Sequence, residues 1–177
     1  MKILLIGIAI VIIGAFFVIQ DLGYQTNTDP NAPDPNVDPD KFNWPDSGPP
    51  EDLTDIEITL ERLGCFGTCP IYSVTIDGNG TVTYDGTRFV KTLGMQTYQI
   101  PQDSVEKLVE LVYQKNYFSL NERYEARATD LPTIITTVRV GNETKTVENY
   151  GGAGPERLSE VERAIDELSD SESLWMK

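Results

Sequence analysis

An uncharged run at the N-terminus limits how much of this chain can form a globular domain. Residues 3–19 read ILLIGIAIVIIGAFFVI and contain no charged side chain. A helix of this length covers about 26 Å of hydrocarbon, close to the thickness of a bilayer core. The run ends without an Ala-x-Ala-like cleavage site, and no cysteine follows it to receive a lipid. We therefore expect an uncleaved signal-anchor over residues 1–20, a single transmembrane helix that contacts the membrane through residues 3–19.

The charges beside this run indicate its orientation. Lys2 precedes it and Asp21 follows it. Positive charge favours the cytoplasmic side, so we expect the N-terminus inside and the C-terminal domain outside the cytoplasm. The predicted location is the cell membrane, with a single pass. A cleaved signal peptide is the alternative, and it also exports the domain.

The next segment has the composition of a spacer. Residues 21–53 hold seven of the eleven prolines, and residues 21–55 contain nine acidic residues against one lysine. Proline fixes φ and removes an amide donor, and so polar a stretch cannot bury enough apolar surface to offset the entropy of ordering. We expect residues 21–53 to be a disordered, solvated stalk. The folded domain is then expected over residues 54–177, long enough for an ordinary core.

Hydrophobic periodicity within residues 54–177 predicts the fold class. Apolar residues alternate with polar ones in several short segments, and two longer segments carry apolar residues on one helical face. Asp77-Gly78-Asn79-Gly80 and Gly141-Asn142 mark hairpin turns, and Asp85-Gly86 is expected to be a further turn. The expected strands are 56–61, 72–76, 82–84, 96–100, 133–140 and 144–149, and the expected helices follow Pro101 and Pro155. These elements predict an α+β domain, an antiparallel sheet built from hairpins with two helices packed on one face.

The composition excludes several classes of function. The chain contains no histidine and has a net charge of −14. The missing histidine removes the commonest general base and transition-metal ligand, together with every Ser-His or Cys-His pair. No segment is basic, so we expect no nucleic-acid partner. The residues indicate no catalytic group, no metal site and no cofactor, and an enzyme is not the expected class.

The two cysteines, Cys65 and Cys69, lie between the first two expected strands. An exported protein with an even number of cysteines is first interpreted as disulfide-bonded. The four-residue separation requires the loop to double back, and Gly67 supplies the necessary freedom. A redox-active pair is an alternative, although only Arg62 is close enough in sequence to activate a thiol. The Cys-x-x-x-Cys-Pro spacing is also similar to that of Sco-type copper chaperones, a thioredoxin-like family whose distant histidine this chain lacks.

The cysteine segment carries a family resemblance. Residues 65–82, CFGTCPIYSVTIDGNGTV, resemble the DUF6438 family of uncharacterised domains. The likeness continues through RFVK at 88–91, YFSL at 117–120 and DLPTI at 130–134, and covers most of residues 56–170. The resemblance implies an exported domain, since many relatives look like lipoproteins, and it supplies no catalytic residues.

Other polar segments have weaker functional interpretations. The glycine-rich segment 151–154 lacks the lysine of a phosphate-binding loop and is expected to connect a strand to a helix. Asn79 and Asn142 begin glycosylation sequons at predicted turns, which matter only in a host that glycosylates exported proteins. The remaining acidic candidates, expected to be solvated rather than paired as acid and base, are Glu122, Glu125 and Asp130.

Two functional hypotheses follow. The favoured one is a non-enzymatic, membrane-anchored extracytoplasmic domain that binds an envelope protein, a glycan or a small ligand. The alternative is an exported thiol-disulfide or copper-handling protein that uses Cys65 and Cys69.

Overall fold

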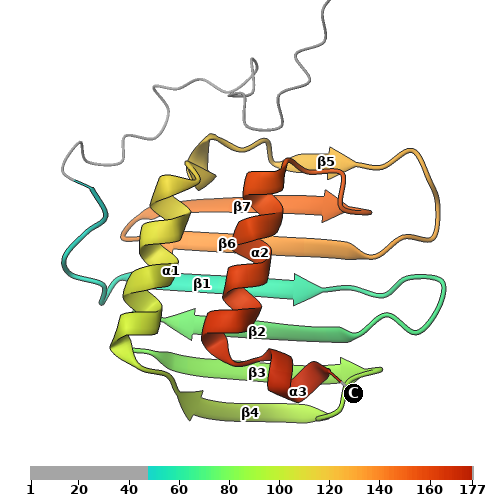
Figure 1. Cartoon of the computed structure of the whole chain (residues 1–177), viewed down its shortest axis with the longest axis horizontal. Helices are drawn as coiled ribbons and strands as arrows, with labels where there is room; N and C mark the ends of the chain where they lie inside the picture. The colour runs from blue at the N-terminus through green and yellow to red at the C-terminus, as the bar shows by residue number, and fades with distance from the viewer. Residues whose placement is uncertain (1–47, 177) are drawn as a thin grey trace, which may run out of the picture.

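A single sheet backed by helices forms the domain (Figure 1). The structure, a computed structural model, describes residues 48–176. The strands are β1 (Ile56–Arg62), β2 (Ile71–Asp77), β3 (Thr81–Arg88), β4 (Gly94–Gln99), β5 (Arg123–Glu125), β6 (Thr133–Val140) and β7 (Glu143–Tyr150). The helices are α1 (Gln102–Gln114), the 3-10 turn η1 (Tyr117–Ser119), α2 (Glu156–Ser169) and the short α3 (Glu172–Trp175).

The seven strands lie in the order β4-β3-β2-β1-β6-β7-β5. Every neighbouring pair is antiparallel except β5 and β7, which are parallel. The domain is therefore α+β as expected, but the expectation of a purely antiparallel sheet is wrong, because the sheet is mixed. β5 has only three residues, too few to show an alternating pattern, and it reaches the edge of the sheet by way of α1 and η1.

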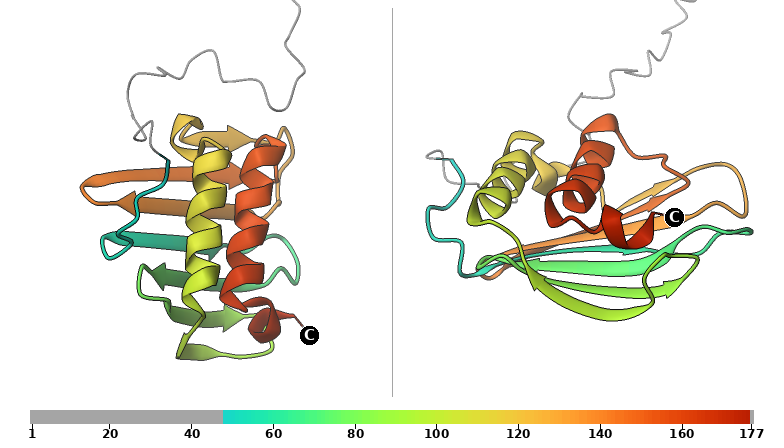
Figure 2. Two further views of the ribbon diagram at one scale, coloured as in Figure 1. Left: turned by 60° about the vertical axis from the view of Figure 1, so that its left-hand side comes forward. Right: turned by 60° about the horizontal axis from the view of Figure 1, so that its bottom comes forward.

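The helices cover one face of the sheet. α1 and α2 lie side by side across the strands, and α3 lies over the end of the sheet that contains β3 and β4 (Figure 2). Each long helix turns a continuous apolar stripe toward the strands, as the 3.6-residue period predicts. The stripe of α1 is Val105, Leu108, Val109 and Val112, and that of α2 includes Leu158, Val161 and Ile165. These residues pack against the inward side chains of the strands to form one core.

The turn expected at Asp85-Gly86 is wrong. Asp85 and Gly86 lie inside β3 rather than in a turn, and the chain reverses only after Phe89, whose φ is 59°. Glycine is required at position 86 because an added Cβ would lie 2.0 Å from the carbonyl oxygen of Thr92. The glycine therefore permits a close backbone approach instead of marking the turn.

The packed region begins earlier than its composition suggests. Leu53, expected to belong to the spacer, is only 9% exposed and joins the main core. Its carbonyl oxygen accepts a hydrogen bond from Ile56 N, and it lies so close to Gly78 that no side chain would fit there. The expected signal-anchor and most of the expected stalk lie outside the described residues. Between residues 48 and 176, no helix is both long and apolar enough to cross a membrane.

Candidate functional site: the disulfide loop and its support

The connection between β1 and β2 contains the predicted disulfide. Cys65 and Cys69 are bonded, with their Cα atoms 5.7 Å apart. Inside the ring, Gly67 N donates to Cys65 O at 2.9 Å, so the chain doubles back at the expected residue. The structure thus confirms the pairing inferred from the spacing.

The loop is also hydrogen-bonded to a neighbouring segment. Leu63 N donates to Thr133 O at 2.9 Å, and Phe66 N donates to Asp130 O at 3.1 Å. Asp130 has a φ of 67° and belongs to the connection between β5 and β6. The two connections therefore support each other, and the backbone of Phe66 is held both by the disulfide and by a hydrogen bond.

Phe66 projects its ring into solvent from this constrained backbone. Its side chain is 89% exposed, the largest value among the exposed large apolar residues of the described chain. The others in that part of the chain are Leu63, Leu93, Met95 and Met176. All five lie at the end of the sheet where β1 and β3 finish and β2 and β4 begin, or at the nearby C-terminus (Figure 1). Apolar exposure concentrated at one end of a domain is typical of an interaction surface.

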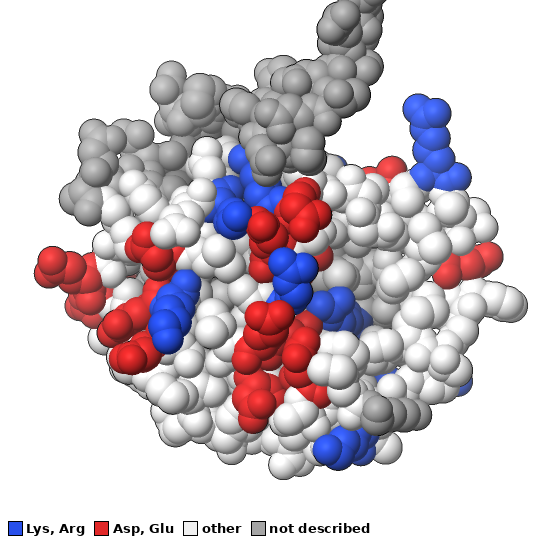
Figure 3. Space-filling model, viewed as in Figure 1, with Lys and Arg blue, Asp and Glu red and all other residues white. Residues whose placement is uncertain are grey.

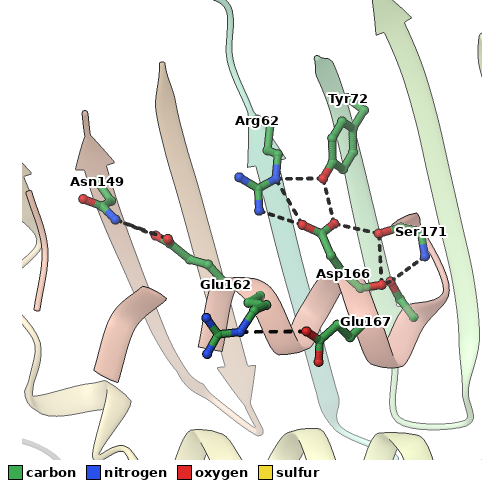
Figure 4. Close-up of polar contacts among 9 residues, drawn as sticks. Arg62, Tyr72, Asn149, Glu162, Asp166, Glu167 and Ser171 are labelled. Atoms are coloured by element: carbon green, nitrogen blue, oxygen red, sulfur yellow. Dashed lines mark hydrogen bonds and ion pairs between the residues drawn. The ribbon is translucent and has the colours of Figure 1, made fainter. Parts of the chain in front are cut away.

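A polar network lies at the base of the loop and fixes its first strand (Figure 4). Arg62, the last residue of β1, donates to Asp166 Oδ2 of α2 from Nη2 at 2.6 Å and from Nε at 3.1 Å. Tyr72, the second residue of β2, donates its hydroxyl to Asp166 Oδ1 at 2.7 Å and accepts from Arg62 Nε at 2.7 Å. Ser171 Oγ donates to the same Oδ1 at 2.7 Å. Both carboxylate oxygens of Asp166 are therefore occupied by donors.

Aromatic packing extends this network. The rings of Tyr72 and Trp175 stack with centroids 5.8 Å apart, and the Arg62 guanidinium lies 6.0 Å from each centroid. Burial and the charge of Asp166 raise the pKa of Tyr72, which keeps the hydroxyl protonated as a donor. Burial disfavours the charge on Arg62, but its interactions with Asp166 and Tyr72 outweigh that effect and raise its pKa.

Asp166, only 1% exposed, is thus a satisfied ion pair that connects the two strands to α2. Because no lone pair or proton is left to act on a substrate, its geometry supports the loop rather than catalysis.

A second buried acid lies one helical turn away. Glu162 is 4% exposed and accepts hydrogen bonds from Asn149 Nδ2 at 3.0 and 3.2 Å. Burial raises its pKa to about 7, against the smaller lowering effects of Asn149 and the charge of Arg62. Asn149 Oδ1 accepts from Gly154 N at 2.9 Å, so the glycine-rich segment is the connector between β7 and α2.

The structure does not bring the remaining acidic candidates together. Glu125 pairs with Arg123, Asp130 uses its carbonyl group to hold Phe66, and Glu122 lies near Lys145. Within residues 48–176, no group of three or more His, Cys, Asp or Glu residues could hold a metal ion.

The sequons at Asn79 and Asn142 are exposed in turns. In the first turn, Asp77 Oδ1 accepts hydrogen bonds from the backbone N–H groups of Asn79 and Thr81, which stabilises the turn.

These features of residues 48–176 define a class of small α+β domain: helices cover one face of a mixed seven-stranded sheet, no described element covers the other face, and a disulfide loop lies at one end. The model of DUF6438, a domain of unknown function, matches residues 56–169, and the chain belongs to that family. Comparison with the curated proteins finds no match.

Proposed function

We propose that this protein is a non-enzymatic, membrane-anchored extracytoplasmic domain that binds a protein partner through the disulfide loop, with Phe66 as the anchor residue. The observation that carries the proposal is the 89% exposed phenylalanine on a loop closed by Cys65 and Cys69. An aromatic side chain held in place before binding loses little entropy on association. The apolar run at residues 3–19 and a disulfide suited to an oxidising compartment support the location.

The shape of the loop favours a protein over a small molecule. Small ligands are bound in concave sites that bury most of their surface. Phe66 instead projects outward, so it requires a concave surface on the partner. Leu63, at the base of the same loop, adds a second exposed apolar side chain.

The charge of the domain favours a protein over a lipid surface. Residues 56–177 contain nineteen acidic and twelve basic residues. Glu106 of α1 and Glu156 and Glu167 of α2 are exposed. Figure 3 shows acidic side chains, with some basic ones among them, gathered on the face that the helices cover. An acidic domain is repelled by the anionic lipids that would otherwise accept an exposed phenylalanine.

The test is site-specific photocrosslinking in the full-length chain. A photoreactive phenylalanine analogue replaces Phe66, and the matched control carries it at Gln114, an exposed position at the end of α1. We expect one discrete protein adduct from position 66 and none from position 114. Phe66→Ser should then weaken co-purification of that protein by at least tenfold, as for an anchor residue worth about 2 kcal/mol.

Three outcomes would contradict the proposal. One is equal labelling from both positions, and another is labelling of lipid alone from position 66. The third is a mixed disulfide trapped by Cys65→Ser or Cys69→Ser, which would favour thiol-disulfide exchange instead.

A further inference from the structure

Within residues 48–176, one edge of the sheet is open and carries no charged side chain. β4 is the terminal strand and pairs only with β3. Its six residues, GMQTYQ, include no charged residue and no proline, and five of them are exposed. Met95, the second residue, is 69% exposed. Figures 1 and 2 show no helix across the outer side of this strand.

The opposite edge is different. There β5 is only three residues long, and it contains Arg123 and Glu125. The part of β7 that β5 leaves uncovered carries Glu143 and Lys145. Short strands and charged side chains are the usual means of preventing strand addition at an edge. The β4 edge has neither, so it has the properties of a pairing edge.

The backbone geometry specifies which groups are free. Ile100 N donates to Gly80 O, so the N–H of Ile100 points toward β3. Backbone groups alternate sides along a strand, which directs the N–H and C=O groups of Met95, Thr97 and Gln99 away from β3. Three outward-facing residues, centred on Thr97, form a self-complementary set.

We propose that two copies of this chain associate through β4, antiparallel and with Thr97 opposite Thr97, so that their sheets join into one. A two-fold axis perpendicular to the sheet keeps both helix layers on the same side. It places Met95 of each copy opposite Gln99 of the other and satisfies all the free backbone groups of the edge.

The open face of the sheet supports this register. Six neighbouring strands, β4, β3, β2, β1, β6 and β7 in their order across the sheet, each contribute one threonine to a continuous row of directly paired residues. The row is Thr97, Thr83, Thr75, Thr59, Thr137 and Thr146. Pairing Thr97 with Thr97 continues the row into the second copy, and threonine pairs are favourable across strands.

Charge does not oppose pairing between two copies. β4 contains no charged residue, so antiparallel pairing about Thr97 places no like charges opposite each other. The nearest charged side chains, Lys91 and Asp103, lie outside the strand, and Lys91 Nζ donates to Ser173 O of the same chain. The self-complementary set centred on Thr97 is what favours a second copy over an unrelated strand.

Cysteine crosslinking of the full-length chain tests the register. In a hydrogen-bonded antiparallel pair the Cα atoms are about 5.5 Å apart, within the range that a disulfide accepts. Thr97→Cys should therefore form a covalent dimer on mild oxidation. Thr146→Cys, an exposed member of the same row on β7, is the matched control and should remain monomeric on a non-reducing gel. Met95→Cys should crosslink when mixed with Gln99→Cys, and neither should crosslink alone.

Sedimentation of the same chain tests the association itself. Thr97→Lys places two like charges opposite each other at the two-fold axis, so dimerisation should weaken by at least tenfold. Thr146→Lys should leave the dimer intact, and equal melting temperatures for the two variants would show that both fold.

The proposal is overturned if Thr97→Cys crosslinks no more than Thr146→Cys, if Met95→Cys crosslinks with itself, or if Thr97→Lys remains as dimeric as its control. Phe66 lies outside β4, so the partner-binding experiment succeeds or fails independently.

Discussion

At the residue scale, the two buried acids of α2 play different roles. Asp166 is neutralised by Arg62 and saturated with donors, whereas Glu162 has only an amide partner. A buried carboxylate without a direct counter-charge is stabilised by taking up a proton. Glu162 therefore makes the stability of the domain depend on pH, while Asp166 holds the strands that support the disulfide loop.

Replacing Glu162 should reveal this dependence. Burial raises the pKa of Glu162 from its ordinary value of 4.5 to about 7 on folding, so the folded state binds the proton more tightly. The contribution of Glu162 to the free energy of unfolding should therefore be greatest below pH 4.5. It should fall as the pH rises toward about 7. Glu162→Gln should remove this slope and raise the free energy of unfolding at about pH 8, by up to about 3 kcal/mol.

Urea unfolding across that pH range measures the effect. Glu156→Gln, an exposed substitution on the same helix, is the control and should keep the wild-type slope. An unchanged slope in Glu162→Gln would show that another group carries the pH dependence.

The residue scale also shows why the support of the loop was not predictable. The pairing of Cys65 with Cys69 is predicted by local spacing together with the expected compartment, and the structure contains it. Arg62 and Asp166 are separated by 104 residues, so their contact depends on the packing of α2 across the sheet. One local signal of buried, paired acids was available in the sequence. Glu162 and Asp166 lie four residues apart beside the apolar stripe of α2, where acidic side chains are seldom buried without partners.

At the scale of elements, periodicity predicted the hairpin strands and both long helices. It failed where an element is too short to have a period: β5, η1 and α3 contain three, three and four residues. It also failed at Gly86, where glycine is needed for a close backbone contact and the local sequence resembles a turn. In each case tertiary contacts, which a single sequence does not display, determine the element.

The start of the domain gives an element-scale prediction. Leu53 is buried beside β1, although its neighbours have the composition of a spacer. Leu53→Ala should lower the free energy of unfolding by about 2 kcal/mol, the lower part of the range for core leucines because the residue lies at the margin of the core. Thermal or chemical unfolding measures this, with Glu51→Ala, an exposed position two residues earlier, as the control. Equal stabilities would show that the packed region begins at Thr54, as its composition suggested.

At the scale of the whole molecule, each side of the sheet has its own role. One face is covered by helices and contains the core, and the other is open in the described chain and carries the threonine row. The exposed apolar residues gather at one end, and the free backbone groups of β4 lie along one edge. The two proposed surfaces share Met95 but have different centres, Phe66 for partner binding and Thr97 for self-association, so the proposed dimer would present two disulfide loops.

Removing the disulfide should separate folding from binding. The ring closed by Cys65 and Cys69 is small, so Cys65→Ser with Cys69→Ser should lower the free energy of unfolding by only about 2 kcal/mol. The domain should still fold, because its core does not include the loop. Phe66 would then be held by one hydrogen bond to Asp130, and the ordering of the loop would oppose association. We expect the doubly substituted chain to lose most of the adduct from position 66 while Thr97→Cys, introduced into it, still crosslinks. Full retention of the adduct would mean that the disulfide does not preorganise the binding loop.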